Sequence, residues 1–242
     1  SQAEVDDEIV NLRRFEIKLP EKRQFFLQNS DLFSNYGAIR TITPFFTRRI
    51  GLARDPEGNL IENDIIGGLR LSGKISTGLK IGFLSMLTNE DKRNEIPSNL
   101  NTVLSLNQKL FNRSALKFLF INRETTKDYD FVDRNDKFNR LIGLEYDLNS
   151  IDNVWNGRFF TYNSFSPLKK ENGFSGGVRV KKETREQEIS FEYSYLGDDF
   201  RSDLGILRRI GVSKFCPYYA YKIYPKKGKV NYHRLAYYHW LW

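Results

Sequence analysis

The sequence is poor in the residues that hold metals and form disulfides. Its 242 residues include one cysteine, Cys216, and two histidines, His233 and His239. A single cysteine excludes an intramolecular disulfide and a zinc cluster built from cysteines. Six positions apart on one strand, the two histidines would lie about 20 Å apart, too far to ligate one metal ion. We therefore predict no metal site and no cofactor.

Long apolar runs are also absent. No window of about 18 apolar residues exists that could cross a bilayer as a helix, and 28% of the residues are charged. A helical membrane protein is therefore excluded, whereas a β-barrel is not, because its strands show only alternating hydrophobicity. An exported protein needs a signal peptide and none begins the sequence, so we expect the natural chain to start earlier.

Recognisable catalytic motifs are few. There is no phosphate-binding glycine loop, nucleophile elbow or metalloprotease helix, and we predict no catalytic residue. Asp198 and Asp199 are adjacent, which places them poorly as a facing acid–base pair. A glycosidase needs two carboxylates about 5 to 9.5 Å apart across a cleft. Glu145, Asp147 and Glu192, on two predicted strands, are expected to face the lumen, and sequence spacing does not fix their separation, so a hydrolytic site stays open as an alternative.

The charge balance is basic, with 38 Lys and Arg against 30 Asp and Glu and a net charge of +8. Nucleic acid suits a basic chain, and the run WNGRFF (155–160) could stack on bases. The basic residues are spread over every predicted hairpin, however, so we predict no nucleic-acid partner. Anionic lipopolysaccharide and the lining of a lumen account for the charge instead. The acidic run 4–8 lacks the spacing of a calcium loop and is expected to be solvated.

Apolar and polar residues alternate from residue 65 onward. This period of two is typical of strands with one apolar and one polar face, and no helical period competes with it. The predicted apolar face carries Leu69, Leu71, Ile81, Phe83, Ile189, Phe191 and Tyr193, and the polar face carries Arg70, Lys80, Ser190 and Glu192. We expect the apolar set to face lipid and the polar set a lumen. The glycine pairs 67–68 and 176–177 are predicted to be strand kinks or bulges.

The strands are expected in five pairs joined by short turns. These pairs are 65–74 with 79–83, 101–108 with 114–122, 138–148 with 154–163, 176–182 with 187–195, and 215–224 with 229–242. Loops between pairs, such as 89–98 and 124–137, are longer. Short turns on one rim and long loops on the other are typical of outer-membrane barrels. The same pattern assigns 197–214 to a long outer segment and 38–52 to a first strand or a segment threading the lumen.

A soluble two-sheet sandwich would show the same alternation, with its apolar faces in a shared core. Two features favour a membrane barrel. The strands have about ten residues, as tilted membrane strands need, and aromatic residues such as Trp155, Phe160 and Tyr162 lie near strand ends. We therefore predict an all-β fold, an antiparallel up-and-down transmembrane β-barrel of about 10–12 strands, complete or as a fragment. Residues 1–52 would form an N-terminal plug segment and 53–242 the barrel.

The N-terminal segment concentrates basic and aromatic residues. Its motif residues are Pro20, Glu21, Lys22, Arg23, Phe25, Phe26, Arg48 and Arg49, for which we predict a structural role. We expect Phe15, Phe25 and Phe26 to be buried against the inner wall or the periplasmic mouth of the barrel, and Arg48 and Arg49 to pair with acidic residues of the lumen. The alternative is a flexible tether, in which both Phe25 and Phe26 would be exposed.

Several stretches carry a family resemblance. PEKRQFF (20–26), with EVDDEIVNL (4–12) before it and FFTRRIGL (45–52) after it, resembles an uncharacterised family of Bacteroidota outer-membrane proteins. The similarity continues through GGLRLSGK (67–74) and WNGRFFTYNSFSP (155–167). Members of that family carry a family-9-type carbohydrate-binding module ahead of a C-terminal β-barrel. The resemblance implies a bacterial outer-membrane location near carbohydrate, but the module itself would precede this sequence, so no sugar-binding residue is assigned.

Together these patterns predict a non-enzymatic anchor or conduit in glycan capture or uptake. The expected partners are outer-membrane lipid and lipopolysaccharide, a glycan, and other outer-membrane proteins. Two alternatives remain: a glycan-hydrolysing enzyme with lumen carboxylates, and a structural subunit of an outer-membrane assembly. Facing carboxylates in a sugar-sized cleft would favour the enzyme, and an occluded lumen with a broad contact surface would favour the subunit.

The C-terminal stretch alternates to its last residue without a turn. One face carries Tyr232, Ala236, Tyr238, Trp240 and Trp242. A membrane barrel closes by pairing its last strand with its first, because open edges are not tolerated in lipid. We expect residues 237–242 to form an unpaired edge and the chain to be incomplete. Pairing with 38–52 or 65–74 would indicate a small closed barrel instead.

Overall fold

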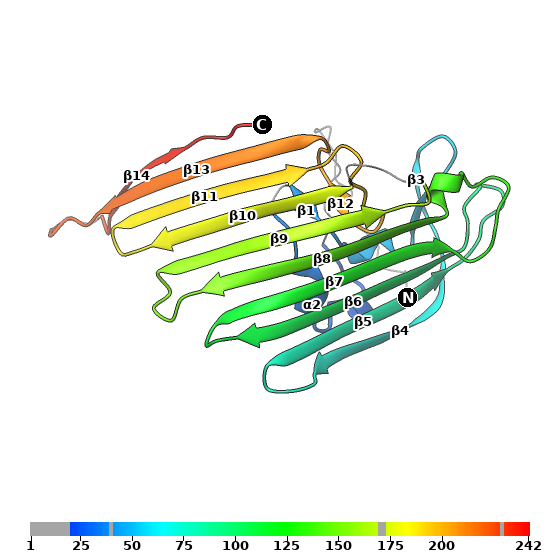
Figure 1. The fold of residues 1–242 in the computed structure, drawn as a ribbon, viewed down its shortest axis with the longest axis horizontal. Helices are drawn as coiled ribbons and strands as arrows, with labels where there is room; N and C mark the ends of the chain where they lie inside the picture. Colours follow the sequence, from blue (N-terminus) through cyan, green and yellow to red (C-terminus); the bar gives the residue numbers. More distant parts are fainter. Residues whose placement is uncertain (1–19, 39–40, 169–172, 228–229) are drawn as a thin grey trace.

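The structure is a computed structural model that describes residues 20–38, 41–168, 173–227 and 230–242. Its main feature is a ten-stranded antiparallel sheet (Figure 1). The strands are β4 (Ile65–Lys74), β5 (Leu79–Thr88), β6 (Asn99–Leu110), β7 (Ser114–Thr125), β8 (Phe138–Asn149), β9 (Trp155–Phe165), β10 (Phe174–Glu183), β11 (Gln187–Leu196), β13 (Val212–Ile223) and β14 (His233–Tyr238). They pair in this order, so the sheet is an up-and-down meander.

The remaining elements are short. They are the helices α1 (Gln24–Leu27) and α2 (Asp31–Ser34), the 3-10 turns η1 (Thr47–Arg49) and η2 (Arg134–Asp136), and the strands β1 (Ile42–Thr43), β2 (Leu52–Arg54), β3 (Leu60–Glu62) and β12 (Ile206–Leu207). In the part of the chain that the structure describes, no helix has the length and apolar character to cross a membrane. The predicted all-β class is confirmed.

The sheet does not close on itself. Its edges are β4 and β14, which lie at opposite sides of the sheet in Figure 1. Within the described ranges β14 pairs with β13 but not with β4, so the predicted closure into a barrel is wrong for this structure. Alternation specifies the two faces of each strand, but closure depends on tilt and stagger accumulated over all strands.

The five predicted strand pairs are confirmed, with most strands somewhat longer than expected. The last pair differs most, because β13 begins within the predicted loop 197–214 and β14 covers only part of 229–242. The described residues of 38–52, which leave out 39 and 40, contribute no strand to the ten-stranded sheet. β1 pairs with β12 instead, and Pro44 follows it directly, where the missing N–H cannot extend a strand ladder.

The two faces of the sheet have opposite character. Leu69 and Leu71 of β4 are 71% and 67% exposed on one side, which we call the outer face. Leu71 is directly opposite Phe83, and Ile189 of β11 is opposite Tyr219 of β13, so the apolar residues of adjacent strands share this face. The predicted division of side chains between two faces is confirmed. Contact of the outer face with lipid stays a prediction.

The other side, the inner face, is covered by the N-terminal segment. Figure 1 shows the helical turns and β1 behind the middle of the sheet. The residues buried in this contact include Phe26, Leu32, Phe33 and Phe45 from the segment and Leu84, Val103, Leu119 and Leu141 from the strands. Full burial of one such side chain stabilises a fold by about 1.5–3 kcal/mol. Hydrophobic contact therefore fixes the segment on the sheet.

The glycine pairs behave differently from each other. The register of β4 shifts between Ile65 and Gly67, so the bulge predicted at 67–68 is confirmed. Gly176 and Gly177 keep a regular register with both neighbouring strands, so a bulge there is wrong. Gly177 instead makes room for the ring of Phe160, from which an added Cβ would lie only 2.6 Å away.

Gly82 of β5 provides a test of how the segment packs. A Cβ at this position would lie 2.8 Å from the Cζ atom of Phe33. We expect Gly82→Val to lower the free energy of unfolding by about 1–3 kcal/mol, because a packed site has no room for extra carbons. Urea unfolding in detergent measures this. The control is Gly73→Val, where the space is open and little change is expected; equal losses would contradict the packing.

Candidate functional site

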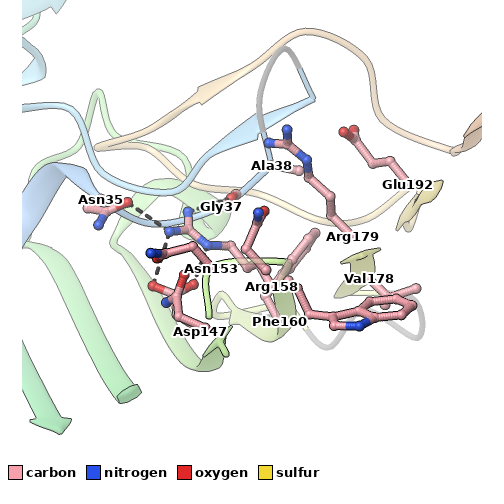
Figure 2. A pocket seen from close by; sticks show the side chains of 14 residues that line it. Asn35, Gly37, Ala38, Asp147, Asn153, Arg158, Phe160, Val178, Arg179 and Glu192 are labelled. Atoms are coloured by element: carbon pink, nitrogen blue, oxygen red, sulfur yellow. Dashed lines mark hydrogen bonds and ion pairs between the residues drawn. The ribbon is translucent and has the colours of Figure 1, made fainter. Parts of the chain in front are cut away.

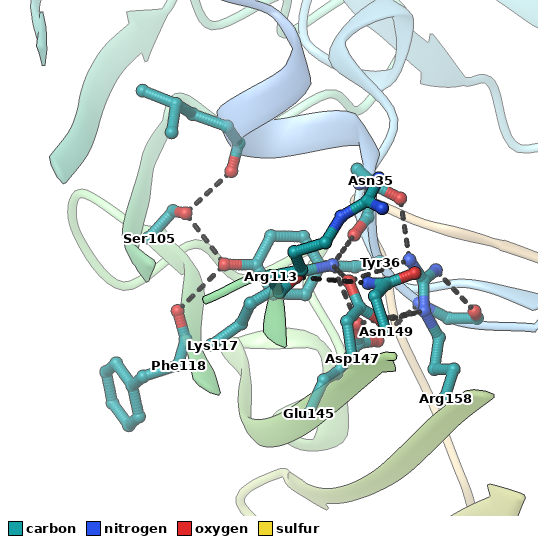
Figure 3. A network of polar contacts seen from close by, with 12 residues as sticks. Asn35, Tyr36, Ser105, Arg113, Lys117, Phe118, Glu145, Asp147, Asn149 and Arg158 are labelled. Carbon is teal, nitrogen blue, oxygen red and sulfur yellow. Dashed lines mark hydrogen bonds and ion pairs between the residues drawn. The ribbon is translucent and has the colours of Figure 1, made fainter. Parts of the chain in front are cut away.

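A polar network lies on the inner face where β7, β8 and β9 meet the N-terminal segment (Figure 3). We call it the Glu145 cluster. Its members are Lys117, Glu145, Asp147, Arg158 and Tyr162 of the strands and Asn35, Tyr36 and Gly37 of the segment. The strands place these side chains on one face because Lys117 is directly opposite Glu145, and Asp147 is directly opposite Arg158.

Glu145 is at the centre of this cluster, and its side chain has no exposed surface. Its Oε1 atom accepts hydrogen bonds from the backbone N–H of Gly37, at 2.5 Å, and from the hydroxyl of Tyr162. Its Oε2 atom lies 3.5 Å from the Nζ atom of Lys117. A buried carboxylate is tolerated only when it is paired and hydrogen-bonded. Here the partners come from both the sheet and the segment.

Asp147 is held by two cations. The Nζ atom of Lys117 lies 2.5 Å from Oδ2, and the Nε atom of Arg158 donates to Oδ1 at 2.7 Å. Arg158 also donates to the Asn35 side chain at 2.8 Å and to the Gly37 carbonyl at 3.2 Å. Its guanidinium therefore links the sheet to the segment while it neutralises Asp147.

Tyr36 anchors the same part of the segment. Its hydroxyl lies 2.7 Å from the hydroxyl of Ser105 and donates to the Phe118 carbonyl at 3.0 Å. Burial raises the pKa of Tyr36 above its ordinary value, so the hydroxyl keeps its proton and remains a donor. Together with the Glu145 cluster, this contact holds the segment in one position over β6 and β7.

The three carboxylates considered for hydrolysis are all engaged. Glu145 and Asp147 both pair with Lys117, and Glu192 accepts a hydrogen bond of 2.8 Å from the Nζ atom of Lys214. A general acid or base must reach the substrate, directly or through one water. Glu145 is fully buried under the segment, so it cannot do this. The arrangement is that of a structural ion network.

The motif around Arg23 folds back on itself. The Nε and Nη2 atoms of Arg23 each donate to the Glu21 carboxylate at 2.8 Å. The other donors reach the carbonyls of Ile50 and Thr47 at 2.9 and 3.0 Å, and the guanidinium lies 4.2 Å from the Phe26 ring centroid. Burial raises the pKa of Glu21, but hydrogen bonds from Arg23 and Thr47 outweigh it and leave the pKa lowered. The motif thus braces the η1 turn.

The arginines of the motif are also placed by backbone carbonyls. Arg48 donates to the Pro20 carbonyl at 2.9 Å, and Arg49 donates through Nε to the Gly205 carbonyl at 3.1 Å. Lys22 is half-buried. The predicted pairing of Arg48 and Arg49 with lumen acids stays a prediction.

The two phenylalanines of the motif differ in their exposure to solvent. Phe26 is buried, as predicted, whereas Phe25 is 45% exposed, so the prediction of burial for Phe25 is wrong. Successive residues of a helix point about 100° apart, so in the short helix α1 only one of the two rings faces the sheet. The exposure of both rings that would have indicated a tether is not found, because Phe26 is buried. Phe15 lies outside the described residues.

A cavity of about 410 Å³ lies beside the Glu145 cluster (Figure 2). Its lining includes Asn35, Gly37, Asp147, Asn153, Asn156, Arg158, Phe160, Arg179 and Glu192. A second hollow, over β10 to β14, shares Arg179 and Glu192 with it. Because guanidinium and amide groups converge here, this part of the inner face can bind a small polar molecule.

The remaining candidate residues do not converge. Cys216 is half-buried and free. His233 begins β14, and His239 follows its end. Asp198 and Asp199 lie in the turn after β11. Across the described ranges, no group of three His, Cys, Asp or Glu residues could hold a metal ion.

Sequence reasoning did not single out Lys117, Arg158 or Arg179. The available signal was their position on the polar side of alternating strands. That signal applies equally to many other residues of the sheet, and the partners in the N-terminal segment are set by the tertiary fold.

Lys117 tests the role of the Glu145 cluster, because its side chain is only 3% exposed and pairs with two carboxylates. Lys117→Gln leaves Glu145 and Asp147 with one fewer cation. We expect a loss of about 3–5 kcal/mol in unfolding free energy, as is typical when one partner of a buried ion pair is removed. Circular dichroism during urea unfolding in detergent measures it.

The matched control is Lys127→Gln, which removes the exposed pair of Lys127 with Glu90. Exposed pairs contribute little, so the unfolding midpoint should hardly move. Similar midpoints for the Lys117 and Lys127 variants would contradict a stabilising role for the cluster.

The chain was compared with known proteins by sequence and by structure. No curated protein matches it, and no solved structure matches it. A family model described as Domain of unknown function (DUF5916) matches residues 1–240, which fits the expected resemblance to an uncharacterised family. The outer-membrane location and the neighbouring carbohydrate-binding module stay predictions. The chain belongs to the family Domain of unknown function (DUF5916).

Proposed function

We propose that the chain forms a lipid-facing wall of a bacterial outer-membrane protein and acts as a non-enzymatic membrane anchor. One observation carries this proposal: the uncovered face of the sheet is apolar, whereas the covered face combines buried charged residues with the apolar contact to the N-terminal segment. The N-terminal segment fills the inner side of the wall, so the anchor is braced by its own chain.

The uncovered face has the opposite polarity to that of a soluble sheet, and the covered face buries charged residues beside its apolar core. An antiparallel sheet with one covered face normally packs apolar residues under the cover and presents polar residues to water. Here Leu69 and Leu71 are exposed on the outer face, while Lys117 and Glu145 are buried on the inner face. Apolar residues outside and polar residues inside are the arrangement of membrane β-structures.

The apolar outer face extends across the sheet. Its exposed members include Leu69, Leu71, Leu100, Leu116, Ile142, Leu144, Phe159, Ile189, Phe191, Tyr193, Tyr219, Leu235 and Tyr237. Large contiguous apolar surfaces are rare on soluble monomers and mark interaction with a membrane or a protein. Since this one runs from the first strand of the sheet to the last, lipid is the partner that fits it.

Strand length and aromatic placement support the same conclusion. Apart from β14, the strands of the ten-stranded sheet have 10 to 12 residues, close to the 9–11 or so that a tilted membrane strand needs. Trp155 and Phe165 are exposed on the outer face at the two ends of β9. Aromatic residues at both interfaces are typical of membrane β-structures.

An anchor fits this structure better than an open conduit or an enzyme. The segment packs on the inner face through the contacts of Tyr36 and Glu145, so the chain itself occupies this part of the face. The carboxylates considered for hydrolysis are neutralised by lysines. The resemblance to outer-membrane proteins with a carbohydrate-binding module makes glycan capture the process that such an anchor would serve.

A charge placed on the outer face tests the proposal. Phe191 and Phe111 are both exposed phenylalanines, at 41% and 85%, but Phe191 lies within β11 and Phe111 in the turn after β6. We expect Phe191→Arg to reduce stability in liposomes by about 2–4 kcal/mol, because arginine near the bilayer midplane is costly. For Phe111→Arg the expected loss is about 0–1 kcal/mol.

The measurement is reversible urea unfolding from liposomes, with insertion confirmed by co-flotation. A soluble protein would tolerate both changes equally well and would stay in the aqueous fraction. That result would contradict membrane anchoring by this sheet.

A further inference from the structure

We propose that the cavity beside the Glu145 cluster binds a small sugar that carries a carboxylate, and that Arg179 recognises the carboxylate. The cavity lies between residues 35–38 of the N-terminal segment and the inner face of β8 to β11 (Figure 2). Its volume of about 410 Å³ is within the range of small-molecule sites, about 300–1,000 Å³.

The charges around the cavity do not balance. The cations are Lys117, Arg158, Arg179 and Lys214, and the carboxylates are Glu145, Asp147 and Glu192. Lys117 and Arg158 neutralise Glu145 and Asp147, and Lys214 is bound to Glu192 at 2.8 Å. One positive charge is left over, and it belongs to Arg179.

Arg179 makes no hydrogen bond or ion pair with any residue that the structure describes. It is directly opposite Arg158 on β9 and Glu192 on β11. Arg158 is held by Asp147 and Glu192 by Lys214, so the charge of Arg179 is not matched by either neighbour. Figure 2 shows Arg158 turned to Asp147 and Asn35, while Arg179 extends away from them toward Ala38. Its donors are therefore available to a ligand.

The other lining groups define the ligand class. A guanidinium presents a planar pair of donors that matches a carboxylate in a bidentate way. Asn153 and Asn156 add amide groups, which both donate to and accept from hydroxyls. Phe160 supplies an apolar surface on the same wall. A ring with several hydroxyls and one carboxylate, that is a uronic acid, uses all three kinds of group.

This site is on the inner face, so ligand binding does not require lipid contact by the outer face. Sugar binding is measured in detergent and membrane anchoring by insertion into liposomes. A chain that does not bind the sugar can therefore still prove to be a membrane anchor, and the reverse also holds.

Isothermal titration calorimetry of the full chain in detergent micelles tests the proposal with galacturonate as the probe. We expect saturable binding by the unchanged chain and at least about a tenfold loss of affinity in Arg179→Gln. Arg179→Lys keeps the charge but not the planar fork, so it should bind with intermediate affinity. The control Arg185→Gln removes the same charge from an exposed turn beside Tyr224 and should bind as the unchanged chain does.

Galactose and inorganic phosphate complete the experiment. We expect galactose to bind much more weakly than galacturonate, and phosphate to compete only weakly because it lacks the hydroxylated ring. Equal affinity for galactose, or undiminished binding by both Arg179 variants, would overturn recognition of the carboxylate by Arg179. Tight phosphate binding without galacturonate binding would overturn the sugar class, and no binding of galacturonate would overturn the site. Circular dichroism melts confirm that each variant is folded.

Discussion

The fold depends on the satisfaction of one buried carboxylate. Glu145 has no exposed surface, and a buried charge is costly unless it is paired and hydrogen-bonded. Lys117 and Tyr162 reach it from the sheet, and the backbone N–H of Gly37 reaches it from the N-terminal segment. All its partners are present only when the segment lies on the inner face. Together with the hydrophobic contact of Phe26 and Phe33, the carboxylate therefore fixes the position of the segment, and its partners allow the covered face to carry charge.

The character of the outer face is linked to that of the covered face, because successive residues of each strand point to opposite sides. The charged residues of the Glu145 cluster lie on the covered side, and period-two alternation places Leu69 and Leu71 on the uncovered side. Leu69 and Leu71 are then exposed, which is unfavourable in water and favourable in lipid. In a bilayer the unpaired backbone groups along β4 and β14 also require partners. The membrane account thus implies further strands beside both edges of the sheet.

The strands and their faces could be predicted because alternation is local, so each hairpin carried its own signal. Closure of the sheet into a barrel could not be predicted, because it depends on the tilt and stagger of all the strands together. The Glu145 cluster could not be predicted, for a different reason. Gly37 and Glu145 are 108 residues apart in sequence, and no local sequence pattern indicates that a backbone N–H will bind a carboxylate. The adjacent rings of Phe25 and Phe26 had the same sequence signal, and only the direction of α1 separates them.

The central claim is that one face of the sheet meets lipid while the other meets the N-terminal segment. Nitroxide labels placed singly at Phe118, Leu119, Phe120 and Ile121 in a Cys216→Ser background, in liposomes, measure this by electron paramagnetic resonance. Labels at 118 and 120 should collide with oxygen and be protected from a water-soluble nickel reagent, while labels at 119 and 121 should be protected from both. High accessibility to the nickel reagent at 118 and 120 would contradict the account.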